Sequence, residues 1–224
     1  MMRFGAMIGR PGRNRTGGGG RLAAHYGHPE LAMVAKKQEF AGYDPRAKQG
    51  IGLAYATSPV GASHMRGDPA YIELLGVPIL IDPLTWVGKA ELVKDWPYVF
   101  AIIDAAGLCV FFSVRNLVTP TRDIRPQGIV ELLNAATGAG YDLDELVRAG
   151  ERIFNAERVF RVKAGISRRD DSLPLRMLRE PIPDGPGKGS VCHLEEMLDP
   201  HYQARGWDQN GVPTEEKLRE LGLA

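Results

Sequence analysis

The most constraining feature of this sequence is residues 142–163, a long segment whose apolar side chains repeat at the spacing of an α-helix. Asp142 is suited to cap the first turn, and Gly165 lies where a helix would end. The pattern therefore predicts one long amphipathic helix with its apolar face toward a core. The residues of that face are Leu146, Ala149, Ile153, Ala156 and Phe160.

Most of the remaining pattern is also helical. Asp44 followed by Pro45 predicts a helix start, with an acidic cap and proline in the first turn. Pro97 is expected to kink its helix or split it in two. Strand signals are few and short, so the predicted fold class is mainly α, with irregular helical domains. The further helices are expected at residues 44–57, 87–106, 127–137 (ended by Gly138), 194–204 and 214–221.

Composition excludes several classes of protein. The 224 residues are 44% hydrophobic and 25% charged, so the chain can bury a core and is not a disordered polypeptide. A net charge of +1 argues against nucleic acid or an anionic membrane as partner. The longest apolar run, residues 98–103, is far shorter than the roughly 20 residues of a spanning helix. With only Cys109 and Cys192, no disulfide framework is possible, which predicts a cytoplasmic protein.

The N-terminal stretch differs from the rest. Residues 1–21 contain four consecutive glycines (17–20) and few large apolar side chains. Residues 13–16 carry no strand pattern, so we expect the glycines to lack the setting of a phosphate-binding loop. We expect a flexible leader over residues 1–21 and one helical region over residues 22–224.

Two short segments carry candidate chemistry. In residues 61–67, His64 could exchange a proton near neutral pH and Arg66 could pair with a phosphate. The alternative is an ordinary loop with a hydrogen-bonded histidine. In residues 104–109, Asp104 closes an apolar helix and would need a polar partner there. Cys109 could face a metal, or it could be a small core residue.

Other polar groups are interpreted as structural. The pair His25 and His28 has no acidic or cysteine neighbour at ligand spacing, and Cys192–His193 is isolated from further ligands. The charged run at residues 168–171 predicts a solvated turn. The sequence contains no Ser-His-Asp signature, phosphate loop or dinucleotide fingerprint.

Taken together, three collinear sets of segments resemble the C-terminal part of the tungsten-containing aldehyde ferredoxin oxidoreductases. The resemblance extends from about residue 25 to the C-terminus. The first set runs from residues 43–46 through 50–58 to 64–67, the second is 104–109, and the third joins 151–155 with 168–174 and is extended by 205–208 and 211–214.

The resemblance implies an oxidoreductase that converts an aldehyde to a carboxylic acid. In that family a tungsten ion is held by two pterins, as a tungstopterin, and electrons pass through a 4Fe-4S cluster to ferredoxin. A β-rich N-terminal base carries the pterins and two helical domains cover them. This chain resembles the helical domains without the base.

The same resemblance implies roles for individual residues. Asp104 corresponds to an aspartate that binds a pterin ring, with Leu108 and Val110 lining that site through their backbone. Cys109 corresponds to the fourth ligand of the 4Fe-4S cluster. The resemblance also places His64 near the metal for proton transfer and Arg66 on the pterin phosphates.

This sequence departs from the family pattern at two points. Pro59 and Val60 stand where the family carries Asn-Arg, and the other three cluster cysteines are absent. Because a four-iron cluster needs about four thiolates, we expect the isolated chain to be inactive. It would act with a separate N-terminal chain of the same enzyme. The alternative is a non-catalytic helical relic or interaction module.

Overall fold

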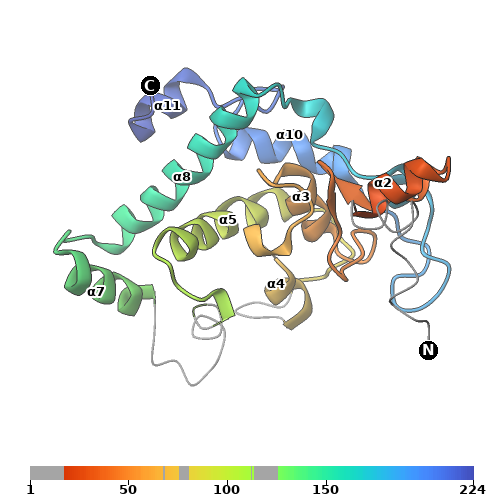
Figure 1. The fold of residues 1–224 in the computed structure, drawn as a ribbon. Helices are drawn as coiled ribbons and strands as arrows, with labels where there is room; N and C mark the ends of the chain where they lie inside the picture. Colours follow the sequence, from red (N-terminus) through yellow and green to blue (C-terminus); the bar gives the residue numbers. More distant parts are fainter. Residues whose placement is uncertain (1–17, 68, 76–80, 112, 114–125) are drawn as a thin grey trace, which may run out of the picture.

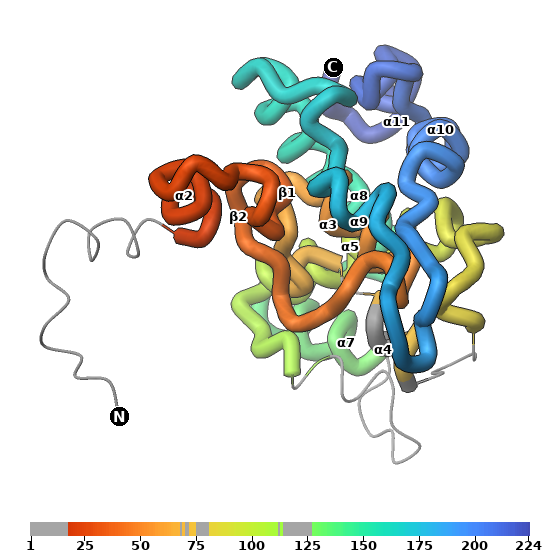
Figure 2. The backbone as a smooth tube through the Cα atoms, turned by 90° about the vertical axis from the view of Figure 1, so that its right-hand side faces the viewer, coloured from red at the N-terminus to blue at the C-terminus, as the bar shows by residue number. Residues whose placement is uncertain are grey.

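Two helices, α5 (Lys89–Ala105) and α8 (Leu143–Lys163), form the most extensive helix pair in the computed structural model, which describes residues 18–67, 69–75, 81–111, 113 and 126–224. Helices α3 and α10 also pack against α5 (Figure 1). Figure 2 shows α2 and a β-hairpin projecting on one side of this helical body. The mainly α fold class predicted from the sequence is confirmed.

The remaining elements are short. They are α2 (Gly18–His25), η2 (Pro29–Leu31), β1 (Val34–Ala35), β2 (Gln38–Glu39), α3 (Gln49–Thr57), η3 (His64–Arg66), α4 (Ala70–Leu75), α7 (Pro126–Thr137), η4 (Arg168–Asp170), α9 (Leu175–Arg179), α10 (Leu194–Ala204) and α11 (Glu215–Leu221). Among the described residues, the one sheet is the antiparallel pair β1–β2, with Val34 opposite Glu39. No helix in the described ranges is both long and apolar enough to cross a membrane.

Helix α8 begins and ends as predicted, but its buried face is rotated. Asp142 accepts a hydrogen bond from the Glu145 backbone, and the Glu145 side chain accepts one from the Asp142 backbone, so the cap is reciprocal. The predicted face is wrong at Ala156 and Phe160, which are exposed, Phe160 at 71%. The buried residues of α8 are Leu146, Gly150, Phe154, Asn155 and Arg158.

Gly150 explains this rotation. A Cβ at this position would lie 2.4 Å from the carbonyl oxygen of Tyr98 and 2.9 Å from the Ile102 side chain. The two helices therefore touch backbone to backbone where α8 carries no side chain. The pattern of apolar side chains could not predict this face. Glycine has no side chain to bury, and its effect here is to let the two helix backbones come close together.

The Gly150→Ala variant should accordingly be less stable, although alanine is the better helix former. We expect a net loss of about 1–2 kcal/mol in the free energy of unfolding, because overpacking against a backbone atom outweighs the propensity gain. Gly20→Ala is the matched control, since its Cβ would meet only Val34 at 3.8 Å. Urea unfolding measures both, and a stabilised Gly150→Ala would contradict this packing.

Helix α5 is continuous through Pro97, so the predicted split does not occur. Proline has no N–H to donate to the carbonyl of Val93 one turn earlier. In the folded chain Nη2 of Arg205 donates to that oxygen at 3.2 Å. A side chain from the end of α10 thus replaces the missing main-chain donor.

Helix α3 starts at Gln49, four residues after Pro45, the predicted first residue of the helix. The Asp44 carboxylate accepts hydrogen bonds from the backbone and the guanidinium of Arg46, closing a separate turn. Helix α3 ends at Thr57, as predicted, and helices α7, α10 and α11 lie where their sequence patterns indicate. Residues 18–21 of the predicted leader form the first half of α2, and residues 1–17 lie outside the described residues.

Candidate functional site

The turn that carries His64 and Arg66 lies against α5. Ser63 accepts a hydrogen bond from the backbone of Met65 at 3.2 Å and so opens η3. Gly67 follows in a left-handed conformation (φ 115°), and a Cβ there would lie 2.6 Å from Cγ of Pro97. Only glycine combines this conformation with so close an approach.

The close approach of Gly67 to Pro97 places Arg66 beside the C-terminal end of α5. Pro97 and Asp104 are seven residues apart, so they lie on the same face of the helix. Nη1 of Arg66 is 3.3 Å from Oδ2 of Asp104 and 3.3 Å from Oε1 of Glu157 on α8. Two segments identified from the sequence, residues 61–67 and 104–109, therefore meet through an ion pair.

Glu157 is a member of this cluster that sequence reasoning missed. Burial raises the pKa of Glu157, Arg66 lowers it and Asp104 raises it, with a net shift upward. Its Oε2 atom is buried and has no hydrogen-bond partner among the described residues. No sequence signal distinguishes Glu157 from the other charged residues of α8, because its role depends on the packing of η3.

Asp104 differs from expectation in its burial. The sequence suggested a carboxylate that would need several hydrogen bonds in an apolar setting, whereas the side chain is 48% exposed and pairs with Arg66. Asp104 is the penultimate residue of α5, where the helix has left the core. Its carboxylate can therefore accept hydrogen bonds from a ligand that lies on this surface.

His64 is half-buried on the same turn as Arg66. Its ring packs edge-on against that of Tyr43, with centroids 5.8 Å apart. This contact joins the beginning and the end of the first resembling set of segments. A role for His64 in proton transfer stays a prediction.

Cys109 is an exposed free thiol, so the small-core-residue alternative is wrong. The flanking residues Leu108 and Val110 are half-buried and pack on the apolar side chains of Phe100 and Ile103 in α5. Their packing holds the segment against the helix end and leaves the sulfur outside. The described residues contain no group of three or more potential metal ligands.

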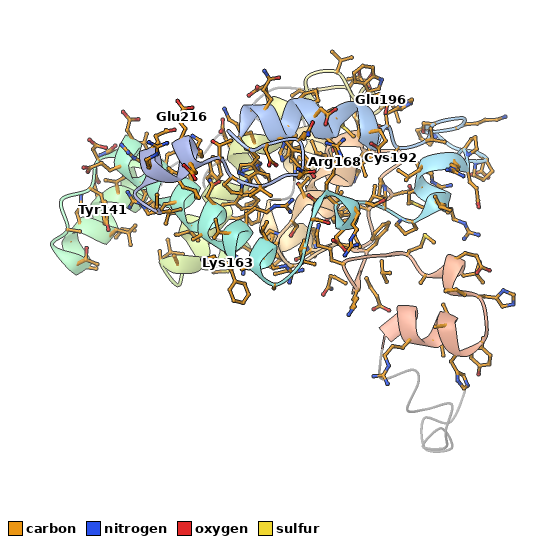
Figure 3. The ribbon with its side chains drawn as sticks, turned by 90° about the horizontal axis from the view of Figure 1, so that it is seen from above. Tyr141, Lys163, Arg168, Cys192, Glu196 and Glu216 are labelled. Carbon is orange, nitrogen blue, oxygen red and sulfur yellow. The ribbon has the colours of Figure 1, made fainter. Side chains whose placement is uncertain are left out.

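Cys192 cannot join Cys109 as a ligand. It is buried, and burial raises its pKa, so the thiol stays protonated. Leu108, next to Cys109, packs against the apolar cluster that includes Ile129 and Val130 of α7. Figure 3 shows Tyr141, which follows α7, far along the molecule from Cys192 at the start of α10.

The run at residues 168–171 is not wholly a solvated turn, because Asp171 is 1% exposed and binds Arg158 and Lys36. A hollow containing His64, Asp104 and Cys109 was also expected. Residues 112 and 114–125, which follow Cys109 in the sequence, lie outside the described residues, so the hollow stays a prediction.

The fold and the site together define a class: a helical domain that presents a cation, a carboxylate and a free thiol near one helix end. A model of the aldehyde ferredoxin oxidoreductase family, domains 2 & 3, matches residues 11–223. The chain belongs to this oxidoreductase family, which confirms the resemblance seen in the sequence. The match begins inside the predicted leader, at residue 11.

Curated relatives agree with this assignment. The chain is 44% identical over 206 residues to the tungsten-containing aldehyde ferredoxin oxidoreductase of Pyrococcus furiosus and 42% identical to that of Thermococcus kodakarensis, covering 91% of this chain in each case. It spans about a third of the length of these relatives, 33%. A more distant relative is the aliphatic sulfonate oxidoreductase, WOR-like subunit, of Pyrococcus furiosus, 31% identical over 176 residues, which are 73% of this chain and 27% of the relative.

A solved structure shows the same fold. The active-site complex BamBC of benzoyl coenzyme A reductase, in complex with 1,5-dienoyl-CoA, aligns with a TM-score of 0.62 over 94% of this chain and 34% of that one. The sequence identity is 21%, so this likeness supports the fold alone.

Proposed function

We propose that this chain supplies the helical cover of an aldehyde-oxidising site whose remaining parts belong to another segment or polypeptide. The reaction would convert an aldehyde to a carboxylic acid in the cytoplasm and deliver electrons to ferredoxin. The observation that carries the proposal is the Arg66–Asp104 contact, which unites two segments of the family motif.

The side chains present fit part of the cofactor set. Arg66 and Asp104 offer a half-exposed cation and carboxylate, suited to hydrogen bonds with a pterin and its phosphates. A bound tungstopterin would supply the two-electron chemistry of aldehyde oxidation. In that setting Arg66 orients an anionic group, Asp104 accepts a hydrogen bond, and His64 holds a proton near the substrate.

The fit to a 4Fe-4S cluster is incomplete. A cluster of this kind takes about four thiolates, and this chain has one accessible thiol, Cys109. Cys109 would serve as one ligand, completed by cysteines from elsewhere, and no electron-transfer step follows from this chain alone.

The test combines this chain with the part of the Pyrococcus furiosus relative that lies outside the match. The complex is reconstituted with iron, sulfide and tungstate. We expect no dye-linked aldehyde oxidation from this chain alone and measurable turnover from the complex. Turnover from the isolated chain, or a complex that binds tungsten and iron fully without activity, would overturn the proposal.

Cysteine variants give a matched comparison. In the reconstituted complex, Cys109→Ser should lower bound iron by at least about one atom of four, because a cluster ligand is lost. Cys192→Ser should leave iron unchanged, since that thiol is buried. Iron analysis and the electron paramagnetic resonance spectrum of the reduced cluster measure the difference, and equal iron in both variants would remove Cys109 from the ligand set.

A further inference from the structure

One groove in this structure shares no lining residue with the site described above. It lies between the β1–β2 hairpin and the segment that links α8 to α9, and its volume is about 900 Å³. We call it the hairpin groove. Apolar walls come from Ala35, Ile166, Leu173 and Pro174. This volume is within the range of sites that hold small organic molecules.

The hairpin beside this groove is strained. Its two-residue loop is Lys36–Lys37, with φ of 46° and 69°. Hairpin loops with two left-handed residues normally carry asparagine or glycine, and each other residue costs about 1 kcal/mol or more there. The conformation is held because Lys36 is buried, with Nζ 2.8 Å from Oδ1 of Asp171 and donating to the carbonyl of Ala56.

The charges around the hairpin groove do not cancel. Most of its charged groups have a partner: Lys36 binds Asp171, Arg176 binds Glu180 at 2.9 Å, and the Asp170 carboxylate accepts from the Ser167 backbone at 2.9 Å.

The remaining acid, Glu30, is 3.0 Å from the ring of His28. The side chains of two lining cations, Lys37 and Arg161, have no ion-pair or hydrogen-bond partner in the described part of the chain. The Nε atom of Arg161 is buried without an acceptor.

A buried guanidinium N–H without an acceptor is costly, about 1–3 kcal/mol. An anionic ligand in the groove would neutralise the two cations, and its hydrogen bonds to the Nη atoms of Arg161 would offset part of that cost. The partnered acids at the rim disfavour a dianion, and the apolar walls favour a ligand with a hydrophobic body. We infer that the hairpin groove binds a monocarboxylate with an apolar or aromatic body, its carboxylate held by Arg161 and Lys37.

Benzoate is a suitable probe, titrated into the isolated chain by calorimetry and by amide chemical shifts of Ile166 and Ser172. Benzamide has the same body without the charge, and inorganic phosphate has the charge without the body. We expect saturable one-to-one binding of benzoate and binding at least tenfold weaker for the other two. No saturation, or equal binding of phosphate or benzamide, would overturn the inference.

Variants localise the binding. Arg161→Gln should weaken benzoate about tenfold to a hundredfold, as expected for a charge-assisted hydrogen bond. Lys37→Asn removes the second cation while keeping a residue that tolerates the left-handed turn, so it tests the site even if Arg161→Gln folds poorly. Arg169→Gln is the control, because that side chain is 83% exposed and does not line the groove. Benzoate affinity unchanged in Lys37→Asn and in folded Arg161→Gln would exclude this site. The inference is independent of the proposed function, since its test needs neither metal nor aldehyde.

Discussion

Replacing Asp171 with asparagine is expected to destabilise the chain by about 3–5 kcal/mol, the cost of leaving buried charges without their partner. Arg158 donates to both carboxylate oxygens of Asp171 at 3.0 and 2.6 Å, Tyr202 donates at 2.5 Å, and Lys36 lies 2.8 Å away. The three partners come from α8, α10 and the hairpin, so one carboxylate joins three parts of the fold.

The neighbouring carboxylate supplies the control. Asp170→Asn should cost about 1 kcal/mol or less, because Asp170 caps a short turn near the surface. Urea unfolding followed by circular dichroism measures both variants. Similar losses for the two variants would show that the buried network does not stabilise this chain.

The pH dependence gives a second signature. Burial alone would raise the pKa of Asp171, but Lys36 and Arg158 outweigh it and the pKa lies below its ordinary value. The stabilisation is therefore complete above the unfolded-state pKa of about 3.9. It is lost as the pH falls through the lowered folded-state pKa. The urea midpoint should decline over this acid range in the wild type and decline less in Asp171→Asn.

Arg205→Ala is the second substitution with a large expected effect, about 3–5 kcal/mol, from a cavity and newly unpaired buried acceptors. The Arg205 side chain is fully buried, and its guanidinium lies 4.2 Å from the ring centroid of Phe154 and 5.1 Å from that of Tyr98. Its Nε donates to Nε2 of His201 at 2.8 Å. Arg169→Ala, at an exposed arginine, should change stability by less than about 0.5 kcal/mol.

A double-mutant cycle separates the contributions of Arg205. Pro97→Ala restores a main-chain N–H for the carbonyl of Val93, so Arg205 is no longer its required donor. In that background the loss from Arg205→Ala should shrink by about 1 kcal/mol, the worth of one hydrogen bond. An identical loss in both backgrounds would mean that Arg205 acts through His201 and the aromatic rings alone.

Helix positions were largely readable from the sequence because their signals are local. The cap at Asp142 and the glycine at position 138 each act within one turn of a helix. Helix α8 begins, and helix α7 ends, where these residues predict. The start of α3 was misplaced because Asp44 has two uses, a helix cap or a turn closed by its own neighbour Arg46. Both satisfy the same carboxylate, and the pattern does not distinguish them.

The assignment of the site residues stays a prediction. The sequence motifs indicate Arg66 and Asp104 as candidate site residues, and the ion pair between them is consistent with a single site. Glu157 and Lys36 were not selected, because each is an ordinary charged residue until α8 or the hairpin delivers it to a partner.

The sequence by itself determined the mainly helical class, most helix boundaries and the family, since these depend on spacing, caps and collinear motifs. Only the tertiary structure decided which face of α8 is buried, how α5 continues through Pro97 and which carboxylate neutralises Lys36 and Arg158. These outcomes depend on atoms brought within about 3 Å of each other from distant parts of the chain. The energy of such contacts depends on how deeply the groups are buried and on the distance and orientation of their partners, and a local pattern of residues does not contain this information.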